Sequence, residues 1–132
     1  MANLQYTSPL FIVANLKASI AFYVDKLGFD VRFIAPPDNP YFAIVGRDNV
    51  ELMIKGDADD AGIKPIPNNT RIWWARWDAF ISTADPDALY EEYQRTGVVF
   101  REPIGINSDG LRGFELEDVN GYVLYFGRPW LK

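Results

Sequence analysis

The sequence carries the same order of predicted elements twice, and this repeat limits the folds that the chain can adopt. Each copy reads as a strand, a helix and three further strands. Pairs of residues at offsets of 69 to 72 positions mark the repeat: Asn15 and Asp85, Tyr23 and Tyr93, Gly28 and Gly97, and Phe42 and Phe114. A duplicated βαβββ unit predicts an α+β chain built from two modules on one plan.

The first module is predicted to span residues 1–54. Asn15 is a good helix N-cap, and the apolar residues that follow recur at helical spacing up to Gly28, a residue type that often ends helices. The alternation of apolar residues predicts a strand before this helix and three after it, at 10–14, 29–35, 41–45 and 50–54. A linker rich in Asp, Pro, Gly and Asn follows at 55–70.

The second module is predicted to span residues 71–132 and repeats this order. Asp85 can cap a helix whose first position is Pro86, and Gly97 closes it. Strands are predicted on either side of this helix, at 73–82, 98–104, 113–117 and 122–126, the last two joined by a turn at 118–121. The chain is therefore expected to be a single domain of two repeats.

Composition excludes several classes of protein. The chain of 132 residues contains neither cysteine nor histidine, so thiolate and imidazole metal ligands and catalytic triads built on them are excluded. A net charge of −5 repels nucleic acid and anionic membranes. Neither a signal-peptide pattern nor an apolar stretch long enough to cross a bilayer occurs. We therefore expect a cytoplasmic protein with no nucleic-acid or membrane partner.

Two stretches resemble a known family. NLKASIAFYVDKLGFDV, from Asn15 to Val31, is similar to the first helix and strand of the glyoxalase/bleomycin-resistance/dioxygenase superfamily, also called vicinal oxygen chelate proteins. GFELEDVNGYVLYFGRP, from Gly113 to Pro129, is similar to its closing hairpin, where the turn usually reads Asp-Pro-Asp-Gly. The resemblance implies two tandem βαβββ modules whose curled mixed sheets surround a cavity, usually in a homodimer.

The resemblance also indicates where a metal would lie. Metal-dependent members bind a divalent ion with His, Glu or Gln at positions that correspond here to Ser8, Glu51, Asp78 and Tyr125. Only Glu51 keeps a family ligand, and Asp78 can offer carboxylate oxygen. Two carboxylates hold magnesium or manganese loosely, whereas imidazole gives such sites their affinity for zinc, iron or nickel. We therefore expect neither a metal nor another cofactor.

The stretch WWARWDAF, residues 73–80, combines aromatic and charged side chains in one predicted strand. Side chains alternate along a strand, so Trp74, Arg76 and Asp78 are expected on the cavity face, with Trp73 and Trp77 on the other. The same alternation turns Glu115 and Tyr125 toward the cavity. It turns their apolar neighbours along the strands toward the helices: Phe114, Leu116, Leu124 and Phe126. The predicted ligand-binding residues are Glu51, Trp74, Arg76, Asp78, Glu115 and Tyr125.

Three functions fit these residues. Aromatic faces and carboxylates favour a planar or cationic ligand, so the first is a metal-free binding protein that sequesters a small molecule, resembling the bleomycin-resistance branch with its bleomycin-type antibiotics. The alternative is a lyase, isomerase or dioxygenase that uses Glu51 and Asp78, or Tyr125, for catalysis. The third is a dimeric regulatory or partner-binding module without a small-molecule site. We favour the binding protein, acting as a homodimer.

Overall fold

The computed structural model describes residues 2–57, 62–68 and 72–130, and the duplicated βαβββ order is present in it. In the first module, the helix is short and its C-terminal half widens into a π-helix, labelled η1. The elements are β1 (Leu10–Ile12), α1 (Leu16–Ala21), η1 (Phe22–Lys26), β2 (Asp30–Ala35), β3 (Phe42–Arg47) and β4 (Val50–Lys55).

The second module repeats this plan with one longer helix. Asp85 accepts a hydrogen bond from the Ala88 N–H as the N-cap, Pro86 opens the helix, and Gly97 ends it at a φ of 80°. These three predictions are confirmed. The elements are β5 (Ala79–Ser82), α2 (Pro86–Thr96), β6 (Val99–Ile106), β7 (Leu111–Glu117) and β8 (Val123–Pro129).

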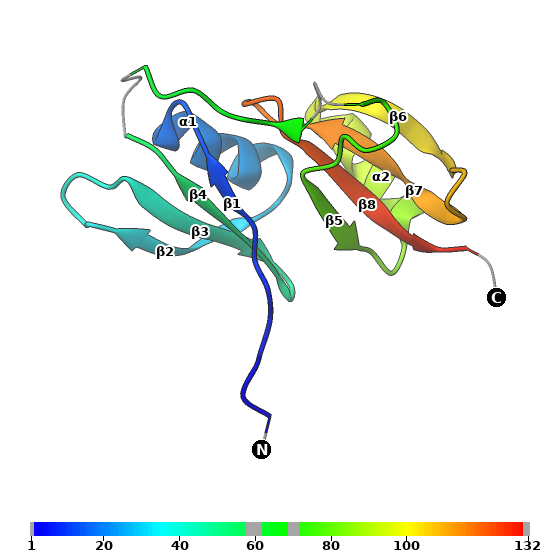
Figure 1. The fold of residues 1–132 in the computed structure, drawn as a ribbon, viewed down its shortest axis with the longest axis horizontal. Helices are drawn as coiled ribbons and strands as arrows, with labels where there is room; N and C mark the ends of the chain where they lie inside the picture. Colours follow the sequence, from blue (N-terminus) through cyan, green and yellow to red (C-terminus); the bar gives the residue numbers. More distant parts are fainter. Residues whose placement is uncertain (1, 58–61, 69–71, 131–132) are drawn as a thin grey trace.

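Each module forms one four-stranded mixed sheet with the same strand order. The first sheet runs β1-β4-β3-β2 and the second β5-β8-β7-β6. The β1–β4 and β5–β8 pairs are parallel, and the remaining pairs are antiparallel. Figure 1 shows the two modules side by side, each with its helix against one face of its sheet. The α+β fold predicted from the repeat is therefore confirmed.

The core lies between each sheet and its helix. The four apolar side chains of the last hairpin, predicted to face the helices, are all buried: Phe114, Leu116, Leu124 and Phe126. Tyr93 of α2 packs edge-on against the rings of Phe114 and Phe126. Within the part of the chain that the structure describes, no helix covers the opposite face of either sheet, which we call the open face.

Side chains from both modules join the two halves. The rings of Phe11 and Tyr122 stack at 4.3 Å between centroids, and the Tyr23 hydroxyl donates to Asp118 Oδ2 at 2.7 Å. Because Tyr23, Phe11 and Tyr122 are each at most 4% exposed, the two modules share one core.

The strand predicted at 73–82 is wrong for its first six residues. Only Ala79–Ser82 form β5, and residues 72–75 make a turn in which the Ala75 N–H donates to the Ile72 carbonyl. The physical reason is the length of the partner strand: β8 starts at Val123, and its ladder with β5 begins at the Ala79–Leu124 pair. Upstream of Asp78, none of the described backbone pairs with this segment to continue the ladder, so alternation of side chains fails there.

The N-terminal segment extends away from the first module, as Figure 1 shows. Residues 2–9 form neither helix nor strand, and Leu4 and Tyr6 are 95% and 63% exposed. Among the described residues, no helix combines the length and the apolar character needed to cross a bilayer.

Candidate functional site

A pocket of about 380 Å³ lies on the open face of the second sheet. Its walls come from the irregular segment before β5, from β6 and from the β6–β7 turn, and its floor comes from β7 and β8. Trp74, Arg76, Glu115 and Tyr125, four of the six predicted site residues, line it together. Trp73 and Trp77 line it too, although alternation along a strand predicted both of them on the other face.

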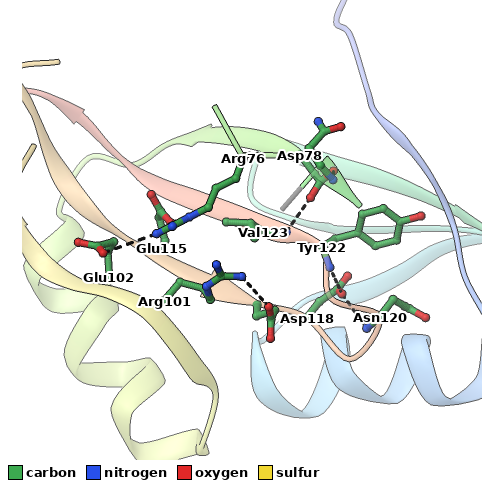
Figure 2. Close-up of polar contacts among 11 residues, drawn as sticks. Arg76, Asp78, Arg101, Glu102, Glu115, Asp118, Asn120, Tyr122 and Val123 are labelled. Atoms are coloured by element: carbon green, nitrogen blue, oxygen red, sulfur yellow. Dashed lines mark hydrogen bonds and ion pairs between the residues drawn. The ribbon is translucent and has the colours of Figure 1, made fainter. Parts of the chain in front are cut away.

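Glu115 organises one wall of this pocket. Arg76 Nε and Nη2 both donate to Glu115 Oε1 at 2.9 Å, and Trp77 Nε1 donates to Glu115 Oε2 at 2.7 Å. A longer ion pair of 3.5 Å links Arg76 to Glu102, as Figure 2 shows. Glu115 is 8% exposed and both of its carboxylate oxygens are occupied. Its contacts therefore position Arg76 and Trp77 and leave no free carboxylate for a ligand.

The Tyr125 ring on the floor of the pocket stacks against two neighbouring rings. The Trp77 and Tyr125 rings lie 4.2 Å apart at 22°, and the Phe80 ring is 5.9 Å from Tyr125 at 14°. Two glycines make room for the Tyr125 ring. A Cβ on Gly113 would lie 2.7 Å from the Tyr125 hydroxyl, and one on Gly127 would lie 2.5 Å from its ring. A sequence signal for this arrangement exists in two glycines on neighbouring strands. Gly113 lies two residues before Glu115, and Gly127 lies two residues after Tyr125.

The Tyr125 hydroxyl has no hydrogen-bond partner among the described residues, although its oxygen is buried. Burial, and then the negative charges of Glu115 and Asp109, raise the pKa of Tyr125 to about 12. The phenol therefore stays protonated at neutral pH and keeps its O–H as a donor.

Two indole rings at the mouth of the pocket remain available. Trp73 and Trp74 are 77% and 66% exposed, and neither ring packs against another described aromatic ring. The exposed carboxylates of Glu102 and Asp109 lie on the same rim. The mouth therefore offers aromatic faces beside negative charge, a combination that suits an aromatic ligand with a cationic group.

Asp78 does not face the pocket, contrary to the sequence prediction. Its Oδ1 accepts from the Asn68 N–H at 2.8 Å and its Oδ2 from the Val123 N–H at 2.9 Å. Figure 2 shows Asp78 turned toward Val123 and away from the Arg76 cluster. Because the segment before Ala79 is not a strand, Asp78 follows no alternation with Arg76. It instead ties the linker to the start of β8.

Glu51 lies on the other module, on the open face of β4. Its Oε2 is 3.5 Å from Arg32 Nη1, and the Ser8 hydroxyl donates to its backbone carbonyl at 2.9 Å. Hydrogen bonding to Glu51 and the charge of that carboxylate raise the pKa of Tyr6. Glu51 does not line the pocket that holds Trp74, Arg76, Glu115 and Tyr125. Within one chain, the structure thus splits the predicted site between two sheets.

The residues at the family's metal positions do not fit a metal site in this chain. Ser8 and Glu51 belong to the first module, while Asp78 and Tyr125 belong to the second, and Asp78 already accepts two backbone hydrogen bonds. Within residues 2–57, 62–68 and 72–130, no group of three acidic side chains is placed to hold an ion. No catalytic step is therefore derived through a metal, and the expected absence of cofactors stays a prediction.

A wider groove of about 490 Å³ lies where the modules meet, and none of the predicted site residues lines it. Across it, the guanidinium of Arg47 forms two hydrogen bonds to the Glu92 carboxylate at 2.9 and 3.0 Å. The same guanidinium donates to the Leu27 carbonyl at 3.0 Å. Because the charged groups satisfy one another, this groove is better explained as a junction between modules than as a ligand site.

Comparisons with known proteins place this geometry in context. The family model described as Glyoxalase/Bleomycin resistance protein/Dioxygenase superfamily matches residues 5–126. A search of curated proteins gave no match.

Solved structures have the same fold. The bleomycin-binding protein from bleomycin-producing Streptomyces verticillus, complexed with copper(II)-bleomycin, is 25% identical, with a TM-score of 0.67 over 96% of this chain and 97% of that one. TnmS3, an antibiotic binding protein from Streptomyces sp. CB03234, is 21% identical, with a TM-score of 0.68 over 98% of both chains. TioX from Micromonospora sp. ML1 is 13% identical, with a TM-score of 0.71 over 95% of this chain and 98% of that one.

Proposed function

The chain belongs to the Glyoxalase/Bleomycin resistance protein/Dioxygenase superfamily, and we propose that it is a binding protein that sequesters an aromatic small molecule without a metal. The observation that carries the proposal is the pocket on the second sheet, where indole faces surround a floor of stacked rings. Pockets with apolar walls and a few fixed polar groups are the usual form of small-molecule sites.

The proposed roles of the residues follow from their contacts. The exposed ring of Trp74 stacks on the ligand, while Glu115 holds Arg76 and Trp77 in place. Tyr125 supplies the floor and a hydroxyl donor. A cationic group on the ligand would lie at the rim near Glu102, which the net charge of −5 also favours.

The class of ligand is proposed from the relatives. The Streptomyces verticillus protein is described as bleomycin-binding and TnmS3 as antibiotic binding. An antibiotic with planar aromatic rings and a positive charge, of which bleomycin-type glycopeptides are one kind, matches the lining of this pocket. The alternative of an enzyme using Glu51 and Asp78 receives no support from their positions on separate modules.

We further propose that the protein acts as a homodimer in which Glu51 reaches the site from the second copy. The open face of the first sheet is apolar: by strand register Leu10, Phe33, Ile44 and Met53 share it with Glu51. Leu10 and Phe33 are 51% and 52% exposed. Exposed apolar faces of this kind mark interaction surfaces. A second copy that covered the pocket with this face would remove both apolar surfaces from water.

The test is thermal unfolding against metal-free bleomycin, a set of planar aromatic cations, and Mg²⁺, Mn²⁺ and Zn²⁺. A ligand that binds only the folded protein raises the unfolding free energy by about 2.7 kcal/mol at a hundredfold excess over its Kd. We expect an organic ligand to stabilise the protein and the metals to have no effect. Stabilisation by one metal alone would refute the proposal.

A pair of tryptophan variants locates the site. Trp74→Ala should weaken binding of the stabilising ligand about threefold to tenfold, because one stacking face is lost. Trp130→Ala is the matched control, since Trp130 is 47% exposed but packs on Arg112 outside the pocket. Equal affinity of the two variants would mean that the ligand binds elsewhere.

A further inference from the structure

We infer that the Tyr125 hydroxyl is a specificity determinant that donates a hydrogen bond to an oxygen acceptor in the plane of the ligand's aromatic rings. The inference rests on the proposed binding function and names the chemistry that the pocket recognises: a planar aromatic compound with a ring carbonyl or a similar acceptor oxygen. A purely cationic or hydrocarbon ring would leave this donor unused.

The Tyr125 hydroxyl differs from the other buried tyrosine hydroxyls. Tyr23 donates to Asp118, Tyr93 to the Leu27 carbonyl at 2.7 Å, and Tyr122 to the Ile12 carbonyl at 2.6 Å. Only the hydroxyl of Tyr125 is buried without a partner among the described residues. An unsatisfied buried hydroxyl destabilises the folded protein, and such a group calls for an explanation. A ligand that satisfies it is the explanation that the pocket offers.

The ring of Tyr125 cannot turn to find a partner within the protein. Trp77 stacks on one side of it at 4.2 Å, and the backbone of β7 and β8 lies close on the other, where Gly113 and Gly127 carry no side chains. The hydroxyl oxygen is therefore held in one place before a ligand arrives. Only the O–H bond still has to turn toward an acceptor, and a donor placed in advance in this way favours one ligand geometry over others.

Nearby acids do not replace the missing acceptor. Glu115 pairs with Tyr125 across the strands, but its carboxylate is turned to Arg76 and Trp77 and accepts no hydrogen bond from the Tyr125 hydroxyl. Burial, and then the negative charges of Glu115 and Asp109, raise the pKa of the phenol, so Tyr125 keeps its proton and acts as a donor and not as a base. Bulk water is excluded from the hydroxyl by the wall that contains Trp77. This wall belongs to residues 72–78, which lie outside the strand ladder, and Tyr125 itself lines the pocket that a ligand would enter.

Tyr125→Phe tests the inference in the free protein first. Removing an unpartnered hydroxyl should leave thermal stability unchanged or raise it. Tyr93→Phe is the matched control, because its hydroxyl is bonded to Leu27, and this variant should be destabilised. If Tyr125→Phe is destabilised as much as Tyr93→Phe, the Tyr125 hydroxyl already has a partner and the inference is wrong.

Ligand preference is then measured with 9-fluorenone and fluorene, planar tricyclic probes that differ by a carbonyl oxygen, through quenching of tryptophan fluorescence. We expect the wild-type protein to bind fluorenone about threefold to tenfold more tightly than fluorene. Tyr125→Phe should lose this preference and bind both equally.

The two proposals fail in different ways. A fluorenone preference that survives in Tyr125→Phe, or no preference in the wild type, overturns the role of the hydroxyl and leaves the aromatic pocket standing. If neither probe binds and the wider panel of organic ligands also has no effect, the binding function itself is wrong.

Discussion

The open faces of the two modules put different side chains on the same backbone plan. In the first sheet, Met53 pairs with Leu10 on one side and with Ile44 on the other. At the corresponding position of the second sheet, Tyr125 pairs with Phe80 and Glu115. At this place the first face is therefore aliphatic, whereas the second combines stacked rings with a buried carboxylate. The two modules thus share a sheet with one open face, and the side chains on that face differ.

The two open faces also differ two residues further along the strands. The first sheet pairs Phe42 with Lys55, and at the corresponding place the second pairs Gly113 with Gly127, so the match of Phe42 with Phe114 predicted from the sequence is wrong by one residue. Two side chains are therefore missing beside Tyr125, and its ring fills the space. The pocket depends on small residues as much as on aromatic ones.

The largest expected difference between the faces concerns their glutamates. Glu115→Gln should lower the unfolding free energy by about 3 kcal/mol, because it breaks a pair whose side chains are only 11% and 15% exposed and removes an acceptor from Arg76 or Trp77. Glu51→Gln should cost less than about 1 kcal/mol, because its pair with Arg32 is longer and more exposed. Urea unfolding of both variants measures the difference, and equal losses would contradict the contrast between the faces.

The next effect concerns the space beside Tyr125. Gly127→Ala should destabilise the protein by about 1–3 kcal/mol, because the new Cβ would overlap the Tyr125 ring and the Arg112 carbonyl. Gly105→Ala is the control in the same pocket, where a Cβ would meet only the Pro103 carbonyl at 3.9 Å. Thermal unfolding should separate the two, and a neutral Gly127→Ala would show that the ring is not confined.

The smallest effect is a pH dependence from the turn of the second module. Burial raises the pKa of Asp118 to about 6, although Tyr23 and two backbone N–H groups donate to it. At this carboxyl the folded protein therefore binds a proton more readily than the unfolded chain does, and proton binding stabilises the fold. This stabilisation is fully present below the unfolded pKa and is lost as pH rises through about 6. Asp118 should make the protein about 1 kcal/mol more stable at pH 5 than at pH 7.

Asp118→Asn isolates this contribution. The variant should lack that part of the pH dependence in urea unfolding measured between pH 5 and pH 7. Asp48→Asn is the control, since Asp48 lies exposed in the hairpin turn of the first module and should leave the profile unchanged. A profile identical in Asp118→Asn and the wild type would contradict the assignment.

The sequence predicted what depends on regular alternation. The buried face of the last hairpin, with Phe114 and Leu124, and the positions of Glu115 and Tyr125 opposite it all follow from a period of two in β7 and β8. The cap at Asp85 and the left-handed Gly97 were equally readable, because their chemistry is local.

The sequence failed where a contact distant along the chain decides the conformation. Asp78 and Trp77 were assigned by alternation, but the segment before Ala79 has no partner strand, and hydrogen bonds to Val123 and Glu115 direct the two side chains. Glu51 and Arg76 are likewise separated because they belong to different sheets. The pattern of residues within one strand does not predict how two sheets are placed relative to each other.

The most direct test of the second module's open face as the ligand site is a nitrogen-15 NMR titration that follows the indole N–H signals of the four tryptophans. The titrant is the organic ligand that stabilises the protein most. We predict that the signals of Trp73, Trp74 and Trp77 shift with saturation, while that of Trp130 stays in place. Saturable binding that leaves those three signals unchanged would contradict the account.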